Sequence, residues 1–444
     1  MRKHFTTALE SRDYGYAVAM EDEEVAVVTD EANQDAAAVA SDLTEAERII
    51  EVSDALEDLA VIADGIDEAT PAEVALIENA GNIAVAGTDV QPEEVVPAME
   101  SYLGRKISTE GIREVARTIW ENIKRFLKNI WDKIESFFYK IFGTIPTLRR
   151  NIESMKKRIE ETVDAGKRAG KDKVKVTSGV TALSINYVPA KTEGDLVSGM
   201  GSLTDYAKYV FGAYVTEIAS TGEVIAKAIG DFDAEKPTDA IGALRKHLDS
   251  RDYLALPKST SGAASRFPGF TVKTSNDLFG NVVLASITFD DKKDNSDLAS
   301  LDRYRRTRME LISSSEKEKS GPSEFEMTTM STAGMEKLLD ESIKLIDMLE
   351  AYKRGSKMKD VQKTRDSIKS ASEKAEKAMG KAKDSDDVAS KAAVPYYKAM
   401  LNFNAAYARW SQTPAMPFLN HSLSTVRAIL SLVGKNLSNY KVNP

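Results

Sequence analysis

The most regular hydrophobic pattern in the chain lies between residues 111 and 142. Apolar residues recur there at steps of three and four positions, which is the period of an α-helix and not of a strand. Lysine and arginine occupy the opposite side, and a helix of this length would be about 48 Å long. The apolar stripe consists of Ile112, Val115, Ile119, Ile123, Phe126, Ile130, Ile134, Phe137 and Ile141. We therefore expect a long amphipathic helix onto which later elements fold.

Further large side chains widen this stripe into a broad apolar face. The residues expected to form its core are Ile119, Trp120, Ile123, Leu127, Trp131 and Phe138. The face suits the core of a helical domain or an interface with another protein. It also suits a helix lying on a membrane surface, where Trp and Phe oppose Lys and Arg. No stretch of about 18 uncharged apolar residues is present, so no span across a bilayer is predicted.

The rest of the chain alternates between helical and strand periods. Gly143 and Pro146 predict a break after the long helix. Pro414 and Pro417 separate the last two helices, which suggests a C-terminal helical hairpin. Stretches of period two rich in β-branched residues predict strands at 174–188, 269–274 and 281–289. Further helices are expected at 42–64, 71–84, 92–103, 147–168, 202–229, 236–249, 332–380, 386–411 and 418–440.

These elements predict a mainly α protein. It would have long amphipathic helices and a small antiparallel β-sheet insertion, preceded by a poorly ordered acidic N-terminal segment. The expected parts are an acidic propeptide-like segment (1–100), long amphipathic and basic helices (101–170), an α+β domain with the small sheet (171–300), a polar linker (301–330) and a C-terminal helical domain (331–444).

The net charge reverses sign near residue 100. Residues 1–100 contain 25 Asp and Glu but only four Lys and Arg, a net charge of −21, whereas the remainder of the 444-residue chain carries +12. Such asymmetry is typical of an acidic tail, or of a removable acidic segment beside a body that tolerates polyanions.

Two basic stretches, 147–175 and 353–383, are either solvated helix faces or sites of non-specific contact with DNA phosphates. The candidate DNA-contacting residues are Arg149, Arg150, Lys156, Lys157, Arg158, Lys357, Lys359 and Lys363.

The sequence offers little for catalysis. There is no cysteine, and His4, His247 and His421 are isolated, without the spacing of metal ligands. Neither a phosphate-binding loop nor a paired nucleophile and base is recognisable. We therefore predict no enzyme activity, no catalytic, cofactor-binding or metal-binding residue and no small-molecule substrate. An enzyme with a site built from scattered residues remains an alternative.

The order of these features resembles the internal head (inner body) proteins of giant tailed phages of the phiKZ-like group. The shared features are the acidic first hundred residues, the helix rich in Ile, Trp, Phe and Lys, and a helical body without a catalytic motif; the likeness is strongest over residues 1–165. The resemblance implies a structural protein inside the virion head, made in the bacterial host cytoplasm. Its partners would be other head proteins and packaged DNA. The alternative is a membrane-associating or membrane-perturbing protein that acts through residues 111–142.

The resemblance also implies trimming by a phage maturation protease, which cuts after Glu in a small-x-Glu pattern. The expected site is Ala98-Met99-Glu100 followed by Ser101, because it coincides with the charge reversal. Before cleavage, the acidic segment could neutralise the basic body and suppress premature phosphate binding. The opposing hypothesis is that these residues stay attached as an acidic tail. Other matches in the acidic segment are Ala8-Leu9-Glu10, Ala55-Leu56-Glu57 and Ala19-Met20-Glu21, the last a secondary candidate. Matches also occur in the body, as in Ser108-Thr109-Glu110, Gly334-Met335-Glu336 and Ala371-Ser372-Glu373.

Overall fold

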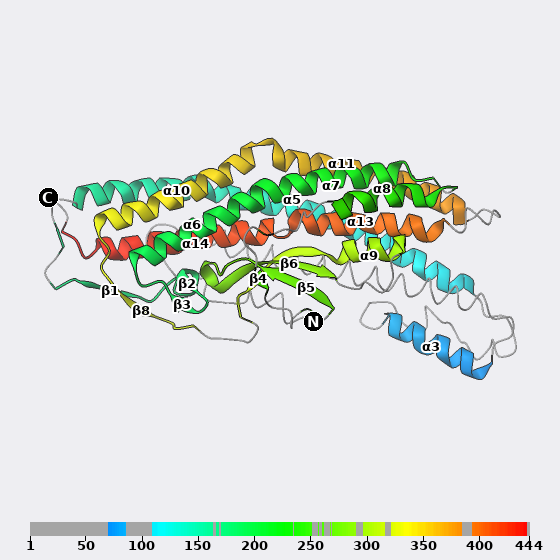
Figure 1. The fold of residues 1–444 in the computed structure, drawn as a ribbon, viewed down its shortest axis with the longest axis horizontal. Coiled ribbons are helices and arrows are strands. Elements are labelled where there is room, and N and C mark those ends of the chain that lie inside the picture. Colours follow the sequence, from blue (N-terminus) through cyan, green and yellow to red (C-terminus); the bar gives the residue numbers. More distant parts are fainter. Residues whose placement is uncertain are drawn as a thin grey trace. The chain divides into compact units, whose positions relative to one another are not determined.

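The fold is mainly helical with small antiparallel sheets, as predicted (Figure 1). The computed structural model describes residues 70–85, 109–162, 166–167, 170–233, 235–250, 256, 260–261, 267, 269–289, 296–315, 321–383 and 393–441. The described residues divide into two compact units. Helix α3 and the start of helix α5, up to Ile134, belong to one unit, and everything from Glu135 onward belongs to the other.

Helix α3 (Pro71–Val85) begins where the sequence predicts. Thr70 and Glu73 form a capping box: the Thr70 backbone N–H donates to Glu73 Oε2 at 2.8 Å, and the Glu73 N–H donates to Thr70 Oγ1 at 3.3 Å. Pro71 takes the first helical position, where its missing N–H costs nothing. The predicted helices at 42–64 and 92–103 lie outside the described residues.

Helix α5 (Thr109–Thr162) contains the whole predicted amphipathic stretch and is longer than expected. The predicted break at Gly143 and Pro146 is wrong, because the helix runs through Pro146 without interruption. Proline in a helix interior costs about 3 kcal/mol through the lost hydrogen bond and the ring clash. Around it Phe142, Ile145 and Leu148 are buried. Burying each such side chain stabilises by about 1.5–3 kcal/mol, which offsets that cost.

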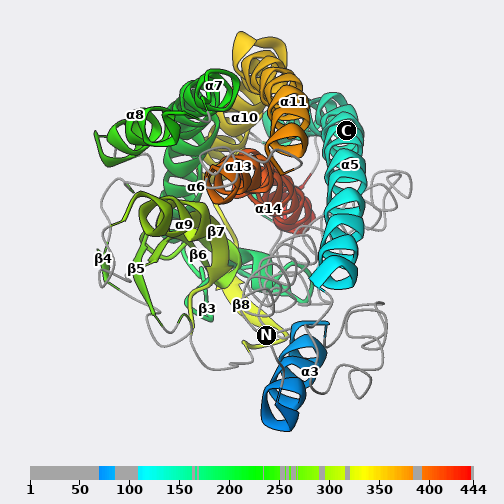
Figure 2. The ribbon, with the colours of Figure 1, turned by 90° about the vertical axis from the view of Figure 1, so that its right-hand side faces the viewer.

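The larger unit is built on long rods of helix that run side by side (Figures 1 and 2). The first rod consists of α6 (Glu193–Lys208), the π-helical segment η4 (Tyr209–Tyr214) and α7 (Val215–Gly230). The second consists of α10 (Thr332–Arg354) and α11 (Ser356–Lys383), and the third of α13 (Val394–Gln412) and α14 (Ala415–Leu437). Helices α6 and α10 pack together, as do α7 and α11, and the last 28 residues of α5 run beside them. Two shorter helices, α8 (Pro237–Ser250) and α9 (Asp297–Arg306), pack against α13.

The predicted C-terminal hairpin is wrong, because α13 and α14 follow one another along one line (Figure 1). The junction lies inside the core and not at a surface turn. There the Tyr214 hydroxyl is 2.9 Å from the carbonyl oxygens of both Trp410 and Thr413, which lie at the end of α13. Helix α14 occupies the middle of the bundle, and most of its residues are buried. Buried carbonyls need such partners, so Tyr214 allows the chain to continue straight through the core.

The irregular points of the rods lie at one level of the bundle. The ring of Phe211 in η4 is 5.0 Å from that of Tyr352, just before the break at Gly355, and 6.3 Å from that of Phe418, just after the α13–α14 junction. Phe142 of α5, near Pro146, is 6.1 Å from the same Tyr352 ring. The predicted single helix over 332–380 is therefore divided at a point where packed aromatic rings hold the rods together.

A four-stranded antiparallel sheet in the order β4-β5-β6-β7 lies beside the rods. Its strands are β4 (Thr260–Ser261), β5 (Phe270–Thr274), β6 (Val282–Phe289) and β7 (Arg308–Ser313). The predicted hairpin of 269–274 and 281–289 is confirmed, with Val272 opposite Ile287. Apolar and polar residues alternate along β5, so a slip by one residue would turn its buried Val272 to the other face of the sheet.

Other predicted elements are corrected by the strand pairing. The stretch 174–188 holds strand β1 (Lys173–Val176), a 3-10 turn and a small hairpin of β2 (Ser184–Ile185) and β3 (Val188–Pro189). Strand β1 pairs with β8 (Phe325–Thr328), and β7 pairs with β6. Residues 301–330 are therefore not a linker: they supply the end of α9 and two paired strands.

Candidate nucleic-acid interface

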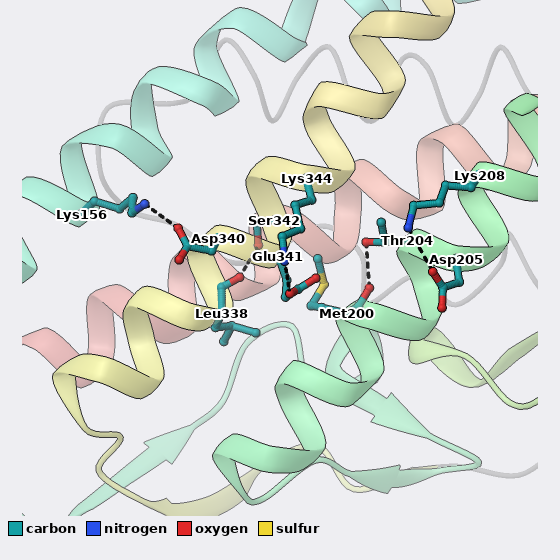
Figure 3. A network of polar contacts seen from close by, with 10 residues as sticks. All are labelled: Lys156, Met200, Thr204, Asp205, Lys208, Leu338, Asp340, Glu341, Ser342 and Lys344. Atoms are coloured by element: carbon teal, nitrogen blue, oxygen red, sulfur yellow. Dashed lines mark hydrogen bonds and ion pairs between the residues drawn. The ribbon is translucent and has the colours of Figure 1, made fainter.

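Two of the predicted DNA-contacting residues on α5 are bound to the neighbouring helix instead. Lys156 Nζ lies 2.5 Å from Asp340 Oδ1 of α10 (Figure 3). Arg149 pairs with Asp347 and, at 3.4 Å, with Glu350. The hydrogen bond that Arg149 donates to Asp347 is the main reason that the pKa of Arg149 is raised. These cations hold α5 against α10, so their charge is already partly neutralised.

The remaining predicted residues on α5 are exposed. Arg150 donates to Thr147 Oγ1 at 3.2 Å, and Arg158 lies 3.8 Å from the sulfur of Met155. Lys157 is exposed and has no ion pair within the described part of the chain. The outer face of this segment therefore presents three cations to solvent.

On α11 the predicted lysines differ in exposure. Lys357 is half-buried, and its Nζ would lie 3.7 Å from a Cβ placed on Gly212 of η4, so it folds back against the first rod. Lys359 and Lys363 are exposed, and neither forms an ion pair with another described residue. Lys359 and Lys363 are therefore accessible from solvent, whereas Lys357 is partly covered by the first rod.

A shallow depression of about 840 Å³ opens between α7 and α11, and we call it the α7–α11 groove. Its floor is made of small residues, Ala226, Gly230 and Ala371. Its polar lining consists of Lys227, Lys363, Lys374, Ser367, Ser370, Asp231 and Asp366. Lys363 was predicted from the sequence, whereas Lys227 was not, because Lys227 lies on α7, which meets α11 only through tertiary packing of segments far apart in the chain. Lys374 lay in the basic stretch 353–383, where periodicity alone could have placed it near the Lys363 face.

Among the described residues no group of three or more His, Asp or Glu side chains could hold a metal ion. His421 is buried, and desolvation lowers its pKa to about 4, so the imidazole is neutral at pH 7. His247 Nε2 lies 3.4 Å from Thr221 Oγ1, and His4 lies outside the described residues. Within the described helices no segment is long and apolar enough to cross a membrane.

Two groups of predicted site residues fall largely outside the described part of the chain. The processing residues Ala98, Met99, Glu100 and Ser101, and the secondary candidate at 19–21, are not described. Side chains in α5 are described from Ser136 onward, so among the predicted core residues only Phe138 has a described position. It is buried, and its ring stacks on that of Phe142 at 5.9 Å.

Comparison with known proteins supports one family. None of the curated proteins or solved structures compared with the chain shows a significant match. The model of the phiKZ-like phage internal head proteins matches residues 22–435. That match spans most of the acidic region, α5, the sheet and the three rods up to the last turn of α14, and agrees with the resemblance seen in the sequence. The chain belongs to the phiKZ-like phage internal head proteins.

Proposed function

We propose that this internal head protein has no enzymatic role and that its net-positive body lies against packaged DNA, which it contacts through phosphate charges. The observation that carries the proposal is the charge reversal, from −21 over residues 1–100 to +12 over the remainder. A net-positive body attracts a polyanion without reading its sequence. We also propose that the protein contacts other head components and is made in the host cytoplasm.

The distribution of cations supports contact that is non-specific. Lys157, Lys359 and Lys363 are exposed and form no ion pair with another described residue, whereas Arg149 and Lys156 are held by α10. Lysine is a flexible point charge, suited to phosphates at variable positions and poorly suited to reading base edges. The body therefore fits a protein that lies in concentrated DNA of any sequence.

Binding to duplex DNA should depend steeply on salt and little on sequence. With about four phosphate contacts, a fragment of residues 101–444 would lose roughly 100-fold in affinity between 50 and 200 mM salt. The full chain should bind more weakly, because its own acidic segment competes for the basic faces. Fluorescence anisotropy with two unrelated duplexes would measure both effects. Equal affinity of the fragment and the full chain throughout the salt titration would refute the competition by the acidic segment. If the fragment bound no DNA, the proposed DNA contact would be refuted.

We also propose that the acidic segment is removed between Glu100 and Ser101. Cleavage there leaves a product of about 344 residues that carries the positive charge. The bond lies within the helix expected over 92–103, but Pro92 and Pro97 disfavour a stable helix there, which leaves backbone that a protease could bind in extended form.

Three matches to the same pattern in the body are poorly placed for cleavage. Gly334-Met335-Glu336 lies in the first turn of α10, where Gly334 and Met335 are buried. Ala371-Ser372-Glu373 lies inside α11, with Ala371 buried. A further match, Ser314-Ser315-Glu316, follows β7, and its Ser315 is buried. Proteases cut exposed, extended backbone, so these surroundings favour a cut before the body.

The membrane alternative gains no support from the described part of residues 111–142. In the last turns of that stretch Phe137, Phe138, Ile141 and Phe142 are buried in the protein. A helix on a membrane surface would need those side chains free to enter the lipid. We therefore favour the DNA-contacting role.

A further inference from the structure

We propose that the α7–α11 groove is the place where the body holds the phosphate backbone of double-stranded DNA. This proposal rests on the proposed DNA contact and assigns it to one surface. It adds Lys227 and Lys374 to the cations that contact DNA.

The cations of the groove are not used by the fold. Elsewhere in the body, cations join elements: Arg149 pairs with α10, and Arg245 of α8 lies 3.0 Å from Asp297 of α9. Lys227, Lys363 and Lys374 are exposed and form no ion pair with any described residue. Three ammonium groups around one depression are therefore available to an outside anion.

The shape of the groove allows a polyanion to come close. Its floor of Ala226, Gly230 and Ala371 keeps bulky side chains away, while the exposed hydroxyl of Ser370 can donate to a phosphate oxygen. Two carboxylates also line the groove. One of them, Asp366, accepts from the Arg365 guanidinium at 3.0 and 3.1 Å, which offsets its repulsion of phosphate.

The row of lysines extends beyond the groove along α11. Lys359 lies one turn before Lys363, and Lys377 lies one turn after Lys374, so the four side chains follow the same side of the helix. From Lys359 to Lys377 this row covers about 27 Å, since each helical residue rises about 1.5 Å. One turn of DNA measures about 34–36 Å, so the row suits a long phosphate backbone better than a single phosphate.

The test compares two triple variants of the full chain with equal loss of charge. One removes the lysines of the groove (Lys227→Ala, Lys363→Ala, Lys374→Ala), and the other removes three exposed lysines on other parts of the larger unit (Lys191→Ala, Lys246→Ala, Lys337→Ala). Anisotropy of a duplex of about 30 base pairs, titrated with salt, gives affinity and the slope of log affinity against log salt. Circular dichroism melts confirm that both variants fold.

The groove variant should lose more than 10-fold in affinity at low salt, and its salt slope should fall by about 2–3, since each phosphate contact contributes about 0.9. The control should change the slope by less than about 1. Equal losses in both variants would overturn the groove while leaving the DNA contact intact. If neither the full chain nor a fragment of residues 101–444 bound DNA at any salt, both the groove and the proposed function would be overturned.

Discussion

Replacing Trp410 by alanine should destabilise the larger unit by about 3–5 kcal/mol, the range for deleting a fully buried large aromatic. Trp410 has 0% exposure and packs edge to face on Phe403, with ring centres 6.0 Å apart. Its indole N–H also donates to the Thr307 carbonyl oxygen at 2.8 Å, which ties α13 to the residue before β7. The substitution leaves both a cavity and a buried carbonyl without its donor. Guanidinium unfolding followed by circular dichroism would measure the loss.

Trp410→Phe separates the two contributions. It keeps most of the apolar contact but removes the indole donor, so we expect a smaller loss of about 1–3 kcal/mol. If Trp410→Ala unfolded within about 1 kcal/mol of the parent, the packing of Trp410 on Phe403 and its hydrogen bond to Thr307 would be contradicted.

Gly199→Ala should destabilise the same unit by about 3 kcal/mol, although it adds only one methyl group. A Cβ at Gly199 would lie 2.3 Å from Cζ and 2.5 Å from Cε2 of Phe279. Phe279 is itself fully buried at 0% exposure, so its ring has no free space to move into. The methyl group must therefore push α6 and the Phe279 segment apart.

Gly201→Ala is a matched control, because it makes the same change two residues later in the same helix. No atom lies within 4 Å of a Cβ at Gly201, and alanine in a helix is favoured over glycine by about 0.5–1 kcal/mol. The two variants should therefore shift the unfolding midpoint in opposite directions. A neutral Gly199→Ala would show that α6 and Phe279 do not pack this closely.

The sequence predicted correctly those elements that are stabilised by residues close to one another along the chain. Strand β5 alternates apolar and polar residues, and β6 is a run rich in β-branched and apolar residues, so pattern and structure agree on this hairpin. Helix α3 carries its own capping box, and the sequence placed its start correctly. Such interactions join residues close along the chain, where a sequence can be read directly.

The wrong predictions share a cause, since tertiary packing overrode local breakers. Pro146 is accommodated because buried neighbours hold α5 on both sides of it. Pro414 ends α13 without reversing the chain, because Tyr214, some 200 residues earlier, lies within hydrogen-bond distance of the carbonyls at that junction. Strand β8 was read as part of a linker because its partner, β1, lies about 150 residues away.

The sequence predicted only part of the candidate interface, because tertiary packing decides which cations remain accessible. The basic composition of α11 located Lys359 and Lys363, but composition cannot say which cations the fold uses. Arg149 and Lys156 are basic in sequence, yet Asp340, Asp347 and Glu350 of α10 pair with them. Lys227 belongs to an otherwise ordinary amphipathic helix, and only its position beside α11 makes it a candidate.

The central claim, an acidic segment that is removed to leave a basic body inside the head, is tested most directly by peptide mapping of purified virions with mass spectrometry. We predict abundant peptides from residues 101–444, a new N-terminus at Ser101 and almost no peptides from residues 25–95. The newly made chain in infected cells should contain the bond between Glu100 and Ser101 intact. Abundant peptides from residues 25–95 in mature particles, or peptides that read through Glu100 into Ser101, would contradict the claim.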